Sequence, residues 1–163
     1  MLVRALDYAA RIYARPEPQS DQCCVFARLL LRELYGSAAI DRVPVSEWHL
    51  WDVTRPWSPV TAAAAAGIAR SQTVPPTAPG LVVGTLHQCQ GWRGTPGAPG
   101  VTGHTWLWWA TTPTHGYQID AAAPPYRTAP GVEVRLRRWA DVVAPYRHGV
   151  AVAVLNNQAS NQR

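Results

Sequence analysis

Two adjacent cysteines, Cys23 and Cys24, begin an apolar segment that reads QCCVFARLLLRELYG. A cysteine in the first turn of a helix lies near unpaired backbone N–H groups and the positive end of the helix dipole. That setting can lower a thiol pKa from ~8.5 to roughly 3.5–7.5, which favours the nucleophilic thiolate. The pair therefore indicates a thiol nucleophile, with two ordinary core cysteines as the alternative, because free cysteine is often buried.

The spacing of apolar residues along this segment distinguishes the two cysteines. Helical spacing predicts one buried stripe, made of Cys23, Phe26, Ala27, Leu30 and Leu34. Steps of four residues from Cys24 instead meet Arg28 and Arg32. We therefore expect Cys23 to face the core and the nucleophilic site, and Cys24 to lie off that face as a structural or resolving thiol. Cys24 remains the alternative nucleophile.

A thiol nucleophile needs a general base, and the base needs a group that orients it. His104 starts the segment HTWLWWAT, and Asp120 lies in GYQIDA, and both segments have the composition of strands. The short connection TTPTHG predicts a hairpin that can bring His104 and Asp120 to one face. A slip of one residue in register would turn Asp120 away. The alternative for Asp120 is a cap or an ion pair with an arginine.

Other side chains of the sequence could bind a metal ion or line a substrate groove. A metal site is not expected, because Cys23, Cys24, His87, Cys89 and His104 contain no Cys-x-x-Cys knuckle, and no cofactor is expected either. Amphipathic rings often line binding sites, although they also cover the core beneath long loops. The candidates for a substrate groove are Trp48, Trp51, Trp92 and Trp106.

The elements that must position these residues can be read from the apolar periodicity. Helices are predicted over 2–14, 22–35 and 60–71, with Ser20 or Asp21 as the N-cap of the second helix. A strand is predicted over 40–45, followed by a tryptophan-rich irregular stretch. Further strands are predicted over 81–89, 104–111, 116–121, 132–136 and 149–155, with a helical turn over 138–143 and a Gly/Pro loop over 91–103.

Helices followed by strands that turn back on themselves predict a single α+β domain. We expect it to span residues 1–155, with N-terminal helices packed on a mostly antiparallel sheet and a disordered tail over 156–163. The chain is 47% hydrophobic and 15% charged, which is typical of a globular protein. The sequence does not indicate an oligomeric state.

Composition also limits the partners. No apolar run approaches the ~20 residues of a membrane span, so no membrane partner is expected. The first residues carry charges unlike a secretory signal, which favours a cytoplasmic location, or a virion or exported location reached without such a signal.

Three cysteines are too few for a disulfide framework. All fifteen basic residues are arginine. Since only RLRRW (135–139) forms a cluster, a solvated basic surface is favoured over a nucleic-acid site.

The order of Cys, His and Asp resembles that of the transglutaminase-like branch of the papain-like cysteine hydrolases, over residues 22–122. CCVFARLLLREL is similar to the family's nucleophile helix, and HTWLWW with GYQIDAA is similar to its two catalytic strands. The resemblance implies a papain-like fold in which Cys23 is the nucleophile, His104 the base and Asp120 the orienting group. Backbone N–H groups at the helix start, supported by a side chain such as Gln22, would form the oxyanion hole.

A second resemblance, to CHAP-type amidases, rests on QCCVF and on Gly103–His104. The two families share the nucleophile and the base and differ in the third residue and the substrate. We therefore expect a thiol-dependent hydrolase or acyltransferase that acts on the amide bonds of a peptide or protein. The alternatives are a peptidoglycan-cleaving amidase or endopeptidase of phage or bacterial origin, and a non-catalytic structural or virion-associated protein that retains the fold.

Overall fold

The computed structural model describes residues 2–12, 22–48, 58–72, 75–76, 78–85, 103–122, 131–146 and 149–156. The helices in these ranges are α1 (Leu2–Ile12), α2 (Gln22–Tyr35), α3 (Ser37–Ile40), the 3-10 helix η1 (Val45–Trp48), α4 (Ser58–Ala65) and α5 (Trp139–Val143). The strands are β1 (Ala69–Gln72), β2 (Gly80–Thr85), β3 (Gly103–Ala110), β4 (His115–Ala122), β5 (Gly131–Arg138) and β6 (Val150–Leu155).

The strands form one six-stranded sheet in the order β1-β6-β2-β3-β4-β5. Every pairing between neighbouring strands is antiparallel. Strands β2 to β5 form a meander, and β6 returns across the sheet to lie between β1 and β2. The expected α+β architecture with a mostly antiparallel sheet is confirmed.

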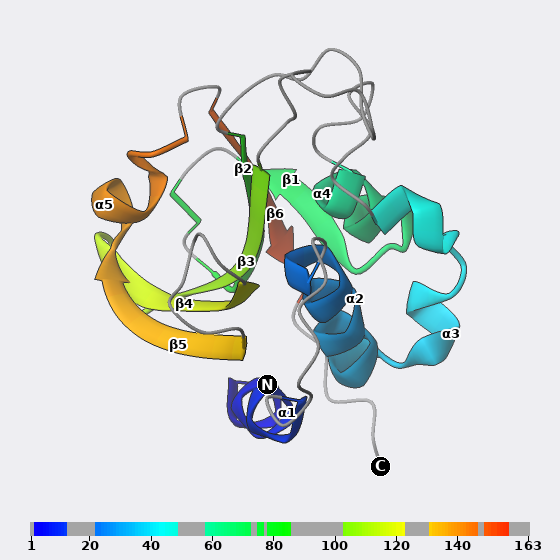
Figure 1. Cartoon of the computed structure of the whole chain (residues 1–163). Helices are drawn as coiled ribbons and strands as arrows, with labels where there is room; N and C mark the ends of the chain where they lie inside the picture. Colours follow the sequence, from blue (N-terminus) through cyan, green and yellow to red (C-terminus); the bar gives the residue numbers. More distant parts are fainter. Residues whose placement is uncertain are drawn as a thin grey trace, which may run out of the picture.

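Both faces of the sheet are covered, which explains why its central strands are apolar on both sides. On one face, α4 packs on β1, β6 and β2, while α2 packs on β3 and β4 and α1 contacts β5 (Figure 1). The sheet gives this core Leu81, Val83, Leu107, Ile119 and Ala153, among others. The opposite face carries Val82, Trp106, Trp108 and Val152, which pack with Val142 of α5.

Two predicted elements are wrong, and glycine geometry gives the reason for each. The predicted strand over 40–45 is instead the end of α3, a turn and the start of η1. Gly36 adopts a φ of 86°, which ends α2 and lets a second short helix begin, with Ile40 buried. The predicted helix over 60–71 ends at Ala65, because Gly67 adopts a φ of 73° and the chain continues as β1.

The remaining boundaries differ less. Residues 86–89 of the strand predicted over 81–89, and nearly all of the loop predicted over 91–103, lie outside the described residues. Asn156, the first residue of the expected disordered tail, is ordered: its backbone N–H donates to Ile68 O at 2.8 Å and its Nδ2 to Gly67 O at 2.9 Å. Residues 157–163 lie outside the described part. In the ranges that are described, no helix is long and apolar enough to cross a membrane.

Candidate active site

The hairpin of β3 and β4 opens at the end where His104 and Asp120 lie. Within these two strands, the Cα pairing runs only from Leu107↔Ile119 to Ala110↔Gly116. His104 is still paired with Gly84 of β2, and Asp120 with Glu133 of β5, so each strand remains attached to its outer neighbour. Helix α2 packs on both β3 and β4. The opening therefore gives side chains from the start of α2 a route to a base on the sheet.

Cys23, His104 and Asp120 meet at this opening. His104 Nε2 lies 2.6 Å from Asp120 Oδ2, with the imidazole donating and the carboxylate accepting. Cys23 and His104 also lie close enough to shift each other's pKa, through a hydrogen bond and through charge. The exposed fraction is 15% for the His104 side chain and 1% for that of Asp120. Cys23 as a residue is partly exposed, whereas the Asp120 side chain behind the base is almost completely buried.

The electrostatics of the three residues favour an ion pair. The pKa of Cys23 lies well below its ordinary value of 9.0, chiefly because Cys24 hydrogen-bonds the sulfur. Burial opposes this shift, while the hydrogen bond and charge of His104, with the Thr105 backbone, add to it. For His104, burial acts to lower the pKa, but its hydrogen bonds to Asp120 and Cys23 outweigh burial and raise the pKa to about 10. The two shifts therefore favour the thiolate–imidazolium form of the pair.

Cys24 is the buried member of the cysteine pair, so the prediction that it lies off the buried face is wrong. Its exposed fraction is 2%, and its sulfur lies 4.0 Å from that of Cys23 and 3.7 Å from Thr105 Oγ1. The reason is that α2 contacts α1, α3, α4 and η1 as well as the sheet. A helix covered on several sides buries more than one stripe, so Cys24 is buried while Cys23 stays partly exposed.

Three residues that were not identified from the sequence support the orienting carboxylate, Gln118 and Arg135 directly and Arg137 through Gln118. Gln118 Nε2 donates to Asp120 Oδ2 at 2.8 Å, and Arg137 Nη1 donates to Gln118 Oε1 at 3.2 Å. Gln118 is 3% exposed. Arg135 Nη2 lies 3.8 Å from the same Asp120 oxygen. Asp120 therefore orients His104 and also lies near an arginine. The orienting role and the ion pair with an arginine, which the sequence offered as alternatives, both apply to it. The spacing in the sequence could have identified Gln118. It precedes Asp120 by two residues, and residues two apart on a strand point to the same face of the sheet.

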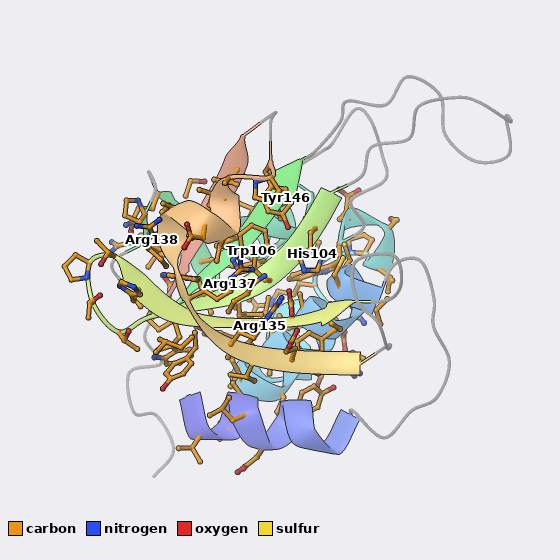
Figure 2. The ribbon with its side chains drawn as sticks, turned by 60° about the vertical axis from the view of Figure 1, so that its left-hand side comes forward. His104, Trp106, Arg135, Arg137, Arg138 and Tyr146 are labelled. Atoms are coloured by element: carbon orange, nitrogen blue, oxygen red, sulfur yellow. The ribbon has the colours of Figure 1, made fainter. Side chains whose placement is uncertain are left out.

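Aromatic rings pack beside the His104 imidazole on its own side of the sheet. The His104 ring stacks on Trp106 with centroids 5.9 Å apart, and Trp106 stacks on Tyr146 at 5.1 Å. Figure 2 shows these three side chains on one side of the sheet. The stack requires a glycine at position 84, because a Cβ there would lie 2.4 Å from the Tyr146 ring. Tyr146 was not identified from the sequence, since it follows the α5 turn with no motif of its own.

Of the four predicted groove tryptophans, the structure describes Trp48 and Trp106, and both are buried. Trp48 is 1% exposed and packs in the core beneath α4, so its predicted place in a substrate groove is wrong. Trp106 is fully buried and touches the base instead of lining an open surface. Trp51 and Trp92 lie outside the described residues. Gln22 is the first residue of α2, but its side chain, like Ser20 and Asp21, lies outside them too.

A metal alternative finds no support in the described ranges, where no three His, Cys, Asp or Glu side chains are grouped as ligands. His87 and Cys89, two members of the set considered, lie outside those ranges. Comparison of the chain with protein-family models, with curated proteins and with solved structures found no match.

Proposed function

We propose that this protein is a cysteine-dependent hydrolase or acyltransferase that cleaves amide bonds, built on a papain-like, transglutaminase-like core. The observation that carries the proposal is the contact of a partly exposed helix-start thiol with an imidazole bound to a buried carboxylate. A structural cysteine does not need a lowered pKa, and a core histidine does not need a raised one. The arrangement of one helix residue with residues of two neighbouring antiparallel strands supports the papain-like assignment.

The chemistry follows from the positions of the three groups. The Cys23 thiolate attacks the carbonyl carbon of the amide, and a C–S bond forms while the carbonyl oxygen takes up the negative charge. Backbone N–H groups in the first turn of α2 are suited to stabilise that oxygen. The His104 imidazolium then gives its proton to the leaving amine as the C–N bond breaks. Asp120 stabilises the imidazolium and holds its ring in orientation.

The resulting thioacyl group passes to water or to an acceptor amine. Neutral His104 now removes a proton from the incoming nucleophile, and the C–S bond breaks to regenerate the thiolate. Water yields a hydrolase and an amine yields an acyltransferase. The acceptor is therefore the only difference between the two activities in this scheme.

The proposal is tested by alkylation with iodoacetamide at pH 6, with the labelled cysteine identified by mass spectrometry. We expect rapid labelling at Cys23, slow labelling at Cys24, and loss of the Cys23 advantage in His104→Ala. Gln72→Leu in β1, at the far edge of the sheet, serves as a control that keeps both catalytic side chains. Equally slow labelling of Cys23 and Cys24 at pH 6 would leave a non-catalytic scaffold as the better description.

A thioacyl intermediate has a direct chemical test. Hydroxylamine intercepts thioesters as hydroxamates, so wild-type protein with an amide substrate should give a hydroxamate that Cys23→Ser does not give. Adding a primary amine separates the activities, because an acyltransferase forms the new amide and a strict hydrolase forms the acid.

Peptidoglycan crosslinks are a second candidate substrate, favoured by the net charge of +5. The clearing of a cell-wall suspension by wild-type protein, but not by Cys23→Ser, would assign them. A soluble peptide amide cleaved without any clearing would assign the general peptide substrate instead.

A further inference from the structure

We propose, on the basis of the cysteine-amidase function above, that Arg137 binds a free carboxylate of the substrate, with Arg135 beside it. The enzyme would then select amides of acidic peptides. The chemistry recognised is a carboxylate, whether from an acidic side chain or from a peptide C-terminus.

The register of β5 places both arginines on the face of the candidate active site. Arg135 is paired with Gln118, and Arg137 with Gly116, so their side chains point to the same side of the sheet as Asp120. Figure 2 shows Arg135 and Arg137 on the side of the sheet that carries Trp106 and His104, with Arg138 farther along at α5. Arg135 Nη2 is 3.8 Å from Asp120 Oδ2, the oxygen that also binds His104.

The ion pairs on this face leave one arginine without a carboxylate. Three carboxylates there already contact other cations. Asp120 binds His104, Glu133 lies 3.0 Å from Arg135 Nε, and Asp141 accepts two hydrogen bonds from Arg138. Arg137 acts on Asp141 only at longer range. Among the described residues, Arg137 therefore has an amide oxygen, that of Gln118, as its hydrogen-bond partner and no carboxylate within ion-pair distance.

The unused donors of this face suit a planar anion. A guanidinium carries five N–H donors in a fork that matches a carboxylate, and Gln118 occupies only one Nη of Arg137. The indole Nε1 of Trp106 is also buried without an acceptor among the described residues. N–H donors thus gather on this face beside the active site, where the buried Asp120 Oδ1 also lacks a partner among the described residues. Such a surface attracts an acidic group and repels a basic one.

The position of Arg137 also sets where the carboxylate must be. The hydrogen-bonded series runs from Arg137 through Gln118 and Asp120 to His104, which contacts Cys23. Three side chains therefore separate the guanidinium from the sulfur. The bound carboxylate must lie more than one residue from the scissile carbonyl, because an extended peptide spans about 3.3–3.6 Å per residue.

The test uses alkylating peptides that carry the anion at a graded distance. N-iodoacetyl-Glu-amide, its Gln-amide counterpart and the Gln free acid form one set, and inserting one or two glycines after the iodoacetyl group extends it. The second-order rate of Cys23 alkylation is measured for each at pH 7. In wild-type protein we expect at least one acidic probe to react about tenfold or more faster than its neutral counterpart. The side-chain and C-terminal acids show which source of carboxylate is preferred.

The ratio of acidic to neutral rates is then compared between variants. Arg137→Gln should bring the ratio close to one, Arg137→Lys should retain part of it, and the matched control Arg138→Gln should leave it unchanged. Should an Arg137 variant fail to fold, glutarate provides the same test in wild-type protein by slowing the acidic probes and sparing the neutral ones. Fast but equal alkylation by acidic and neutral probes would overturn this inference alone. Slow alkylation of Cys23 by every probe and by iodoacetamide would overturn the proposed function with it.

Discussion

The sulfur of Cys24 lies 3.7 Å from the hydroxyl oxygen of Thr105, so the residue that follows the candidate nucleophile contacts the residue that follows the candidate base. Both side chains are buried, at 2% and 1% exposed. This contact fixes the first turn of α2 against β3, and it thereby fixes the approach of Cys23 to His104. Cys24 thus acts on the site in two ways, through this anchor and through its hydrogen bond to the Cys23 sulfur.

Removal of Cys24 should make Cys23 less acidic. Cys24→Ala deletes the interaction that contributes most to the lowered pKa of Cys23, so we expect that pKa to rise and iodoacetamide labelling at pH 6 to slow about tenfold. The small cavity should cost about 1 kcal/mol of unfolding free energy, measured in urea. Thr105→Val keeps the Cys23–Cys24 contact and serves as the control. A Cys24→Ala protein that labels at the wild-type rate would show that the contact does not tune the thiol.

The pH dependence of activity should have two limits. Amide cleavage needs ionised Cys23 and protonated His104, so the rate should rise as pH passes the lowered pKa of Cys23 and fall again near pH 10. Asp120→Asn removes the charge that raises the pKa of His104, so the upper limit should move down toward 6.5. The measurement is kcat/KM against pH. An upper limit that stays near 10 in Asp120→Asn would show that the carboxylate does not control the base.

Stability should depend on pH through the same pair. The raised pKa of His104 stabilises the fold fully below 6.5, and that contribution is lost as pH rises to about 10. The lowered pKa of Cys23 stabilises the fold above 9.0, and that contribution is lost as pH falls through the folded value. As pH rises, the thiol therefore adds stability between its folded pKa and 9.0, the imidazole loses stability between 6.5 and about 10, and above 9.0 only the loss remains. Urea midpoints across this range provide the measurement.

The Cys23→Ala variant separates the two contributions to the pH dependence of stability, that of the thiol on the acid side and that of the imidazole on the alkaline side. In Cys23→Ala the acid limb should disappear, because the thiol no longer changes protonation on folding. The alkaline limb should remain, since Asp120 still raises the pKa of His104. If the curves of wild type and Cys23→Ala have the same slope at every pH below 9.0, the pKa of Cys23 is not lowered in the folded protein.

Gln118 should act as a positioning residue for the base. Gln118→Leu removes the 2.8 Å hydrogen bond to Asp120 and the acceptor of Arg137, so kcat should fall about tenfold with little change in KM. The resonance of His104 in an NMR titration should also show a lower pKa, which a purely structural role would not produce. Gln72→Leu in β1, at the far edge of the sheet, is the control. An unchanged His104 titration in Gln118→Leu contradicts the role.

Gly84 should be essential for the aromatic support of His104. A Cβ at position 84 would lie 2.4 Å from the Tyr146 ring, so Gly84→Ala must displace Tyr146 from its stack on Trp106. We expect a loss of about 1–3 kcal/mol in unfolding free energy, typical of overpacking. Gly80→Ala in the same strand meets Pro76 at 3.3 Å and should cost less than about 1 kcal/mol. Equal urea midpoints for the two variants would remove this explanation.

Local sequence patterns predicted most helices and strands, because apolar periodicity and turn residues act over a few neighbouring positions. The helix over 22–35 and the hairpin of β3 and β4 follow from apolar periodicity and a short polar connection. The pattern failed over 40–45, where the short helix α3 follows Gly36, and over 60–71, where Gly67 at positive φ ends the helix inside an alanine-rich run. An alanine run followed by Ile68 does not distinguish a continuing helix from a helix that is followed by a strand. Pairing of β1 with β6 decides it.

The sequence by itself determined which residue types could do chemistry here and in which elements they stand: a thiol at a helix start, and an imidazole and a carboxylate on two strands of one hairpin. Only the tertiary structure decided how they meet. The separation of β3 from β4 beyond Leu107, the burial of Cys24 instead of Cys23, and the support of Asp120 by Gln118 and Arg137 all depend on packing between distant segments. Contacts between segments far apart in the chain leave no periodicity in the sequence, because each depends on the shape of the partner surface.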